Sequence, residues 1–266
     1  MSDAAATAVP PVRAAYDAVA ATYEAQVAPS VWVRERLWQR LDALFAPGAR
    51  VLDATAGTGR DAAHLAARGV AVSACDLSPA MLSQLAARHP RIPTRVADCG
   101  RLREAFPGER FDGVISTFAG LNTAPDLAGF ARGAAGLLAP GGVLLVHLLN
   151  RWPVADLLRR CRRGDRGAAV RAGVGACWRG VRRHEIAGVP VLHRLHSPRR
   201  LYRRIFAADF VLSRVSGLAV VRPVDDPPAG AGVHLERWEE RLGAWPITRC
   251  LGTFFALEMR RRAVRR

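Results

Sequence analysis

The stretch VLDATAGTG, residues 51–59, decides the fold class of this 266-residue chain. Val51 to Asp53 reads as the end of a short buried strand, and a glycine-containing loop then leads into a helical pattern that begins at Arg60. Glycines in such a loop let a ligand lie against bare backbone at the N-terminus of the helix. The stretch therefore predicts a strand–loop–helix unit with a ligand site at the carboxyl edge of a sheet.

Strands and helices continue to alternate after this unit. Further strands are expected over residues 70–75, 94–97, 113–116 and 143–149, with helices over residues 60–68, 79–88 and 126–138. Ser78 and Pro79 supply an N-cap and a proline at the first helical position of one of these helices. Such alternation with short loops predicts an α/β fold, in which helices cover both faces of a parallel sheet.

The flanking segments break this alternation. Residues 14–45 have the apolar spacing of a helix, whereas residues 184–196 alternate like an antiparallel hairpin. In the last part of the chain a helix is expected over residues 201–208, one long strand or a pair over 210–221 and a final strand over 253–259. We therefore expect an N-terminal helical cap (1–46), a ligand-binding core (47–150), an inserted substrate lid (151–200) and a C-terminal part of the core (201–266).

Two more acids end the next two expected strands. Asp76 is placed to accept hydrogen bonds from ribose hydroxyls, and Asp98 from an adenine amino group, while the backbone after Asp98 can donate to the adenine ring. Each acid alone resembles a surface aspartate that starts a loop. With Asp53, however, three consecutive strands end in an acid, which favours a nucleoside-binding edge.

The rival interpretation is a dinucleotide fold, because Gly57, Gly59 and Ala62 formally match its fingerprint. In that fold Asp53 would lie beside a pyrophosphate, where a second negative charge is unfavourable. S-adenosylmethionine (SAM) has no phosphate and carries an ammonium and a sulfonium. The acid therefore favours SAM over NAD.

The segments VLDATAGTGRDAAHLA, ACDLSPAML, VADC, FDGVISTF and GLLAPGGVLL resemble those of the class I SAM-dependent methyltransferases, over roughly residues 10–150. This resemblance implies a Rossmann-like, mostly parallel seven-stranded sheet and SAM as the cofactor. It assigns SAM contacts to Tyr23, Asp53, Ala56, Gly57, Gly59, Asp76, Leu77, Asp98, Cys99, Ser116, Thr117 and Phe118. Tyr23, or else Tyr16, would cover the methionine end of SAM. Thr55 departs from the family, which usually has the first glycine of the loop there.

Methyl transfer is an in-line displacement, so positioning the acceptor can supply most of the catalysis. A general base is needed only when the acceptor arrives protonated, and the sequence need not contain a fixed catalytic residue. The candidates near the expected pocket are Tyr23, Asn122, His147 and Asn150. His147 lies inside an apolar run, where a packed strand histidine is the simpler interpretation. Asn150, with Trp152, follows the strand end and is expected to line the pocket.

The formal charge of +16 invites a nucleic-acid interpretation, yet all 39 basic residues are arginine, which indicates a compositional bias over the whole surface. Nucleic-acid amino-methyltransferases carry an Asn/Asp-Pro-Pro-aromatic motif where this chain has residues 116–119, and residues 226–228 (Asp-Pro-Pro) come too late in the chain. A small-molecule acceptor is therefore favoured, and the arginines of residues 159–166 could select an acidic one. A tRNA or rRNA methyltransferase and a SAM-binding protein without methyl transfer are the alternatives.

The five cysteines are dispersed and the histidines of the insertion lack metal-ligand spacing, so no metal site is expected. The absence of a secretory pattern and of any long apolar run favours the cytoplasm and predicts no membrane span.

Overall fold

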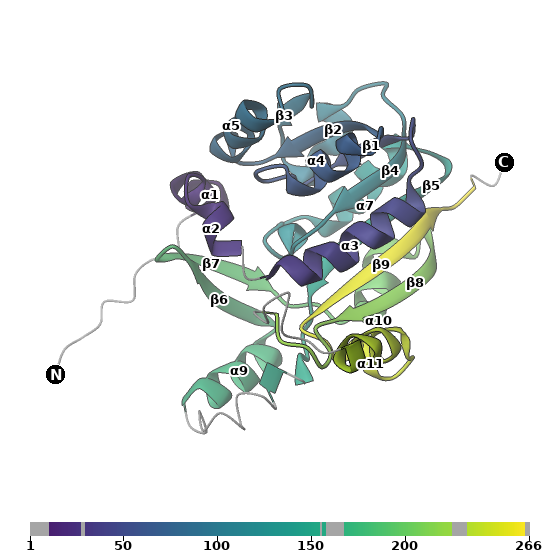
Figure 1. Cartoon of the computed structure of the whole chain (residues 1–266). Helices are drawn as coiled ribbons and strands as arrows, with labels where there is room; N and C mark the ends of the chain where they lie inside the picture. Colours follow the sequence, from purple (N-terminus) through teal and green to yellow (C-terminus); the bar gives the residue numbers. More distant parts are fainter. Residues whose placement is uncertain (1–10, 28–29, 155, 158–167, 225–232, 264–266) are drawn as a thin grey trace.

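A computed structural model describes residues 11–27, 30–154, 156–157, 168–224 and 233–263 of the chain. Its main feature is a seven-stranded sheet in the order β3-β2-β1-β4-β5-β9-β8 (Figure 1). The strands are β1 (Arg50–Asp53), β2 (Ala71–Asp76), β3 (Thr94–Val96), β4 (Phe111–Ser116), β5 (Leu138–Leu149), β8 (Phe210–Leu218) and β9 (Phe254–Arg261). Strands β1 to β5 run parallel to one another, whereas β9 runs antiparallel to both β5 and β8. The prediction of a mostly parallel, seven-stranded Rossmann-like sheet is confirmed.

Helices cover both faces of this sheet because successive strand residues point to opposite sides. The helices of these two layers are α3 (Val31–Leu44), α4 (Arg60–Ala67), α5 (Pro79–Arg88), α6 (Leu102–Ala105), α7 (Leu127–Leu137) and α10 (Pro198–Leu201). In β4, Ile115 packs with α3, α4 and α5, while its neighbour Val114 packs with α6, α7 and the segment after α10. Both faces of the central strands are therefore buried, as expected of a parallel sheet.

Two of the predicted helices begin at the capping residues that the sequence indicates. Ser78 accepts a hydrogen bond from the backbone N–H of Met81 and Asp126 one from Gly129, so both act as N-caps. The helical prediction over residues 14–45 was too simple, because the chain there forms three helices, α1 (Val12–Val19), α2 (Tyr23–Val27) and α3. A turn at Thr22, which bonds back to the carbonyl of Val19, separates the first two.

A two-stranded hairpin follows the insertion's helix α9 (Ala168–Arg179). Its strands are β6 (Val181–Ile186) and β7 (Val189–Arg194). Ala187 and Gly188 between them both have positive φ, 48° and 79°, as a two-residue hairpin turn requires. Helix α1 packs against β7, so the hairpin lies beside the N-terminal helices at one side of the molecule (Figure 1).

The C-terminal part adds α11 (Val233–Ala244), which packs against β8. The strand expected over residues 210–221 ends at Leu218, just before Ala219 with a positive φ of 55°. The helix expected over residues 201–208 is a short α-helix followed by a π-helical turn, Tyr202–Phe206. Among the described residues, no helix has both the length and the apolar character needed to cross a bilayer.

The packing of Phe45 on β4 gives a stability prediction. A Cβ added at Gly113 would lie 2.2 Å from an atom of the Phe45 ring, which is itself buried. We expect Gly113→Ala to lower the free energy of unfolding by about 1–3 kcal/mol through overpacking. In denaturant titrations the double variant with Phe45→Ala should lose less than the sum of the two single changes. Strict additivity would show that the two side chains do not compete for this space.

Candidate active site

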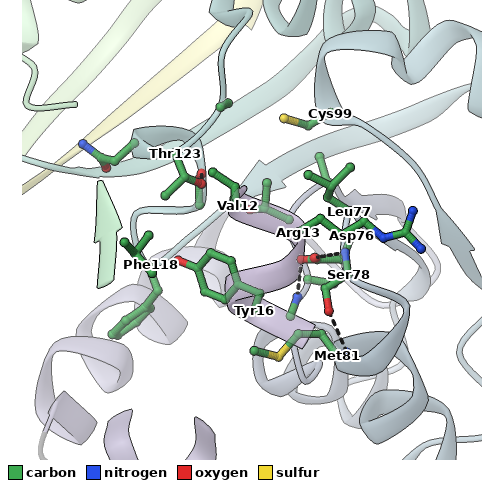
Figure 2. Close-up of a pocket in the computed structure, with 18 of the residues that line it drawn as sticks. Val12, Arg13, Tyr16, Asp76, Leu77, Ser78, Met81, Cys99, Phe118 and Thr123 are labelled. Atoms are coloured by element: carbon green, nitrogen blue, oxygen red, sulfur yellow. Dashed lines mark hydrogen bonds between the residues drawn. The ribbon is translucent and has the colours of Figure 1, made fainter. Parts of the chain in front are cut away.

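A cavity of ≈ 800 Å³ opens at the carboxyl edge of the parallel strands. Its walls come from the loop after β1, from the ends of β2, β3 and β4, from α1 and from the hairpin (Figure 2). The structure brings ten of the sequence-predicted residues together around it, namely Tyr23, Ala56, Gly57, Asp76, Leu77, Asp98, Cys99, Thr117, Phe118 and Asn122. Five others, Asp53, Gly59, Ser116, His147 and Asn150, do not line it.

Asp76 is held at the cavity wall by the backbone. Its two carboxylate oxygens accept hydrogen bonds from the N–H groups of Gly57 and Ser78, each at 2.9 Å. Burial raises its pKa, while these backbone donors act in the opposite direction. The glycine loop and the end of β2 are thus joined through one carboxylate, which keeps further lone pairs for a ligand hydroxyl.

Asp98 and Cys99 lie at the end of β3. Asp98 accepts from the backbone N–H of Gly100 at 2.8 Å and caps the following 3₁₀ turn. Burial, and then the charge of Asp98, raise the pKa of the Cys99 thiol to about 12. The thiol is therefore neutral at physiological pH and forms an apolar part of the wall.

Asp53 lies beneath the loop instead of in the cavity. It is 1% exposed, and its side chain accepts from the backbone N–H of Thr55 at 3.4 Å. Burial and the negative charge of Asp61 raise its pKa well above the usual range. Its position supports the loop from below.

Gly59 and Ser116 also shape the loop from outside the cavity. Gly59 has a φ of 87°, and a Cβ there would collide with the Leu85 side chain. Ser116 shares a hydrogen bond of 2.7 Å with the hydroxyl of Thr55, the residue that departs from the family pattern. Thr55 is thus accommodated by a polar partner on β4.

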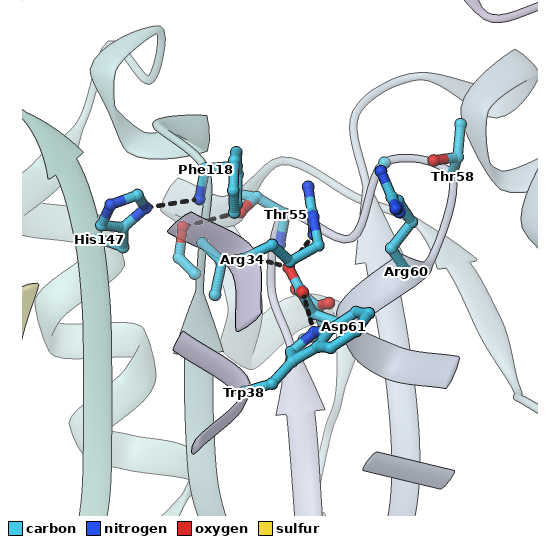
Figure 3. A network of polar contacts seen from close by, with 12 residues as sticks. Arg34, Trp38, Thr55, Thr58, Arg60, Asp61, Phe118 and His147 are labelled. Carbon is cyan, nitrogen blue, oxygen red and sulfur yellow. Dashed lines mark hydrogen bonds and ion pairs between the residues drawn. The ribbon is translucent and has the colours of Figure 1, made fainter. Parts of the chain in front are cut away.

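A buried polar network that no sequence motif predicts lies at the floor of the cavity (Figure 3). Asp61 accepts from Arg34 at 2.6 Å, from the Trp38 indole at 2.7 Å and from the Thr117 hydroxyl. Burial alone would raise the pKa of Asp61, but the Arg34 guanidinium and these hydrogen bonds outweigh it and lower the pKa. The carboxylate is therefore ionised, and Arg34 and Asp61 form a buried ion pair that faces the cavity.

The N-terminal helices also bind the glycine loop. Glu24 accepts from the Thr58 hydroxyl and forms ion pairs with Arg60 at 3.5 Å and Arg88 at 3.4 Å. Tyr16 and Tyr23 flank this contact with their rings in edge-to-face geometry at 6.3 Å, and both line the cavity. Figure 2 shows Tyr16 projecting from α1 between Phe118 and Met81.

Two of the catalytic candidates have structural roles instead. The Nδ1 atom of His147 accepts from the backbone N–H of Phe118 at 3.1 Å, and its carbonyl accepts from Ala119. These bonds hold Phe118 and Ala119 at positive φ, 48° and 67°, in the loop after β4. The expectation that Asn150 lines the pocket is wrong, because its amide is buried and donates to the carbonyls of Cys250 and Gly252.

Asn122 does line the cavity, but its amide is engaged. It donates to the carbonyl of Arg194 at 2.5 Å and accepts from the backbone N–H of Leu149 at 2.9 Å. The Asn122 side chain thereby connects the end of β7 to the end of β5 and has a structural role. The arginines of residues 159–166, expected to select an acidic acceptor, lie outside the described residues.

The burial of His147 predicts a pH dependence of stability. Burial lowers its pKa from 6.5 to about 3, so below pH 6.5 the unfolded chain gains a proton that the folded protein excludes. This histidine should therefore reduce the free energy of unfolding by about 2 kcal/mol between pH 7 and pH 5. Asparagine preserves an acceptor near Nδ1 but does not titrate. Denaturant titrations at both pH values should show a drop about 2 kcal/mol smaller for His147→Asn, and equal drops would contradict the assignment.

Comparison with known proteins agrees with this geometry. Residues 51–142 match the family model described as a methyltransferase domain. The chain is 40% identical over 124 residues to a demethylmenaquinone methyltransferase of Beutenbergia cavernae, an alignment that covers 46% of this chain and 50% of the relative. It is 37% identical over 117 residues to a ubiquinone biosynthesis O-methyltransferase of Xanthomonas campestris, over 42% of this chain and 48% of the relative.

The chain thus spans about half the length of the curated relatives it matches. Among solved structures, the DhpI–SAH complex superposes with a TM-score of 0.60 and 20% identity over 94% of each chain, which shows a shared fold. The matched segment carries the loop after β1 and the acids that end β2 and β3. From this match, residues 51–142 are a class I SAM-dependent methyltransferase domain, and the order of the sheet is the one found in that class.

Proposed function

We propose that the protein transfers the methyl group of SAM to a small-molecule nucleophile bound in the ≈ 800 Å³ cavity. The observation that carries this proposal is the meeting of Asp76, Asp98 and the glycine loop at one edge of a methyltransferase domain. In an open α/β sheet, ligands bind at this edge, beside the point where the strand order reverses. Here that point lies between β1 and β4.

The nucleoside half of SAM fits the β2–β3 side of the cavity. Asp76 would accept from the ribose hydroxyls, and Asp98 from the adenine amino group, with Leu77 and Cys99 packing beside the rings. Carboxylates that accept such bonds in a partly dry site give charge-assisted contacts, which are stronger than neutral ones. Gly57 leaves room for close approach, since nothing lies within 4 Å of a Cβ built there.

The methionine half of SAM would then extend toward β1 and β4, where the Arg34–Asp61 pair faces the cavity. The amino-acid end of SAM is a zwitterion with one carboxylate and one ammonium. A fixed guanidinium–carboxylate pair is complementary to it, with Arg34 toward the carboxylate and Asp61 toward the ammonium. We assign to Asp61 the role that the resemblance gave to Asp53, because Asp53 is buried beneath the loop.

The chemistry needs little beyond this placement. The acceptor's lone pair forms a bond to the methyl carbon while the carbon–sulfur bond breaks and its electrons return to sulfur, which leaves neutral S-adenosylhomocysteine (SAH). Any proton on the acceptor passes to water or to a base. Tyr16 and Tyr23 are poor bases, because burial raises the pKa of both phenols. The cavity therefore acts chiefly by holding the two reactants in line.

A small-molecule acceptor fits both the site and the relatives. Two relatives act, by their names, in menaquinone and ubiquinone biosynthesis. The β6–β7 hairpin supplies Val181, Val191, Leu192 and Arg194 to the cavity wall, and we propose that it is part of a lid formed by residues 151–200 over the acceptor. A concave, largely apolar cavity of this size suits a compact molecule better than a nucleic acid.

The two halves of the cofactor site can be tested separately. Asp76→Ala should weaken both SAH and 5′-methylthioadenosine by roughly 2–3 kcal/mol, since both ligands carry the ribose. Arg34→Lys keeps a cation beside Asp61 but loses the planar fork, so it should weaken SAH about tenfold and leave methylthioadenosine, which lacks the amino-acid end, unchanged. Calorimetric titrations measure both, with the exposed Glu104→Gln as control. An equal loss of both ligands in Arg34→Lys would refute the methionine-end assignment.

The activity itself is tested with labelled SAM. We expect the protein to bind SAH and not NAD, and to transfer label to a small molecule in a metabolite extract. Asp76→Ala should lower this transfer at least tenfold at limiting SAM. Binding of NAD without any response to SAH would overturn the proposal. Label transferred to RNA, with retention on RNA that falls steeply with salt, would favour the nucleic-acid alternative.

A further inference from the structure

One wall of the cavity is formed by α1 and the β6–β7 hairpin. Ala15 and Val19 of α1 pack with Ile186 and Val191 of the hairpin and with Met81 of α5 in one buried cluster. Of these residues Met81 and Val191 line the cavity, together with Val12, Val181 and Leu192. The apolar character of these side chains suits an acceptor with an apolar body.

Four arginines line the cavity, and they differ in their partners. Arg34 pairs with Asp61 at 2.6 Å, Arg60 with Glu24 at 3.5 Å and Arg13 with Asp17 at 3.6 Å. Arg194 is the exception, because in the part of the chain that the structure describes it forms no ion pair with a carboxylate. Its Nη1 atom donates to the backbone carbonyls of Ala124 at 3.1 Å and Pro125 at 3.4 Å.

These contacts hold Arg194 in place. Its guanidinium is bonded to the loop before α7, and its own carbonyl accepts from the buried amide of Asn122. A guanidinium has five N–H donors, so donors remain for a ligand after the two carbonyls are satisfied. A positioned cation whose charge is not neutralised by a neighbouring carboxylate favours an anion, and its planar fork matches a carboxylate.

We propose that the acceptor is an apolar, aromatic-sized molecule that carries a carboxylate, and that Arg194 binds this carboxylate while the side chains of α1 and the hairpin enclose the apolar body. Leu192 and Arg194 alternate along β7 and so share one face of the strand, both at the cavity. The apolar contact and the charge contact therefore come from one strand. This inference rests on the proposed function, since it concerns the acceptor end of the same cavity.

The test compares two probes of equal size on protein saturated with SAH. The probes are 2-naphthoate and its neutral counterpart 2-naphthamide, titrated calorimetrically. We expect the wild-type protein to bind naphthoate at least tenfold more tightly than naphthamide. Arg194→Gln should reduce this ratio to about one, whereas Arg199→Gln, which changes an exposed arginine outside the cavity lining, should retain it.

A second variant covers the case in which Arg194→Gln disturbs the hairpin. Leu192 is 43% exposed, so Leu192→Asp should fold, and it places a carboxylate beside an unchanged Arg194. It should also reduce the naphthoate preference to about one.

SAH affinity, measured first on every sample, separates the two proposals. Failure to bind SAH would count against the proposed function. SAH binding with no wild-type preference for naphthoate, or with a preference that survives in both variants, would overturn the carboxylate-binding role of Arg194.

Discussion

The ion pair between Arg34 and Asp61 joins the parts of the molecule that make the cavity. Arg34 belongs to α3, Asp61 to the first turn of α4, and Thr117, which also donates to Asp61, follows β4. Removing one partner of such a buried pair leaves an uncompensated charge and typically costs 3–5 kcal/mol. Helix α3 is therefore bound to the core through the same residues that form the cavity floor. The positions of the glycine loop and of the loop after β4 depend on this contact.

Further polar contacts join the first two N-terminal helices to the loops that line the cavity. Glu24 of α2 binds Thr58 and Arg60 of the glycine loop, and Asp17 of α1 accepts from Ser78 at 2.6 Å beside Asp76. Helices α1 and α2 thus each contribute one carboxylate that binds residues lining the cavity. Figure 1 shows these helices on the same side of the molecule as the hairpin. Helices that precede residues 51–142 in the sequence therefore form part of the cavity wall.

The part of the structure that local rules determine could be predicted from the sequence. Alternating strands and helices, the Ser78 cap and the acids at the ends of β2 and β3 are encoded in short stretches, and all appear at the expected places. The roles of Asp53 and Asp61 could not be separated in this way. Both acids flank the same loop, and it is Asp61, bound by Arg34 and Trp38 of α3, that lines the cavity.

Long-range contacts explain the remaining differences. Asn150 was expected in the pocket because it follows a strand, yet carbonyls 100 and 102 residues later in the chain bind its amide. Helix α9 was not predicted, because its glycines weaken the helical signal. Helix α11 was also not predicted. Its buried Glu239 accepts hydrogen bonds from three consecutive backbone N–H groups after β8, those of Val220, Val221 and Arg222. No local sequence pattern predicts the hydrogen-bond partners of Asn150 or Glu239.

The place of β9 in the sheet has a consequence for how the protein is made. This strand lies between β5 and β8, and its Glu258 accepts two hydrogen bonds of 2.8 Å from Arg40 of α3. During synthesis, β5 is complete more than one hundred residues before β9 emerges. Until then β5 has an open edge next to apolar side chains, which is the kind of surface that recruits strands from other chains. The nascent protein therefore passes through an aggregation-prone stage that ends only when residues 254–261 enter the sheet.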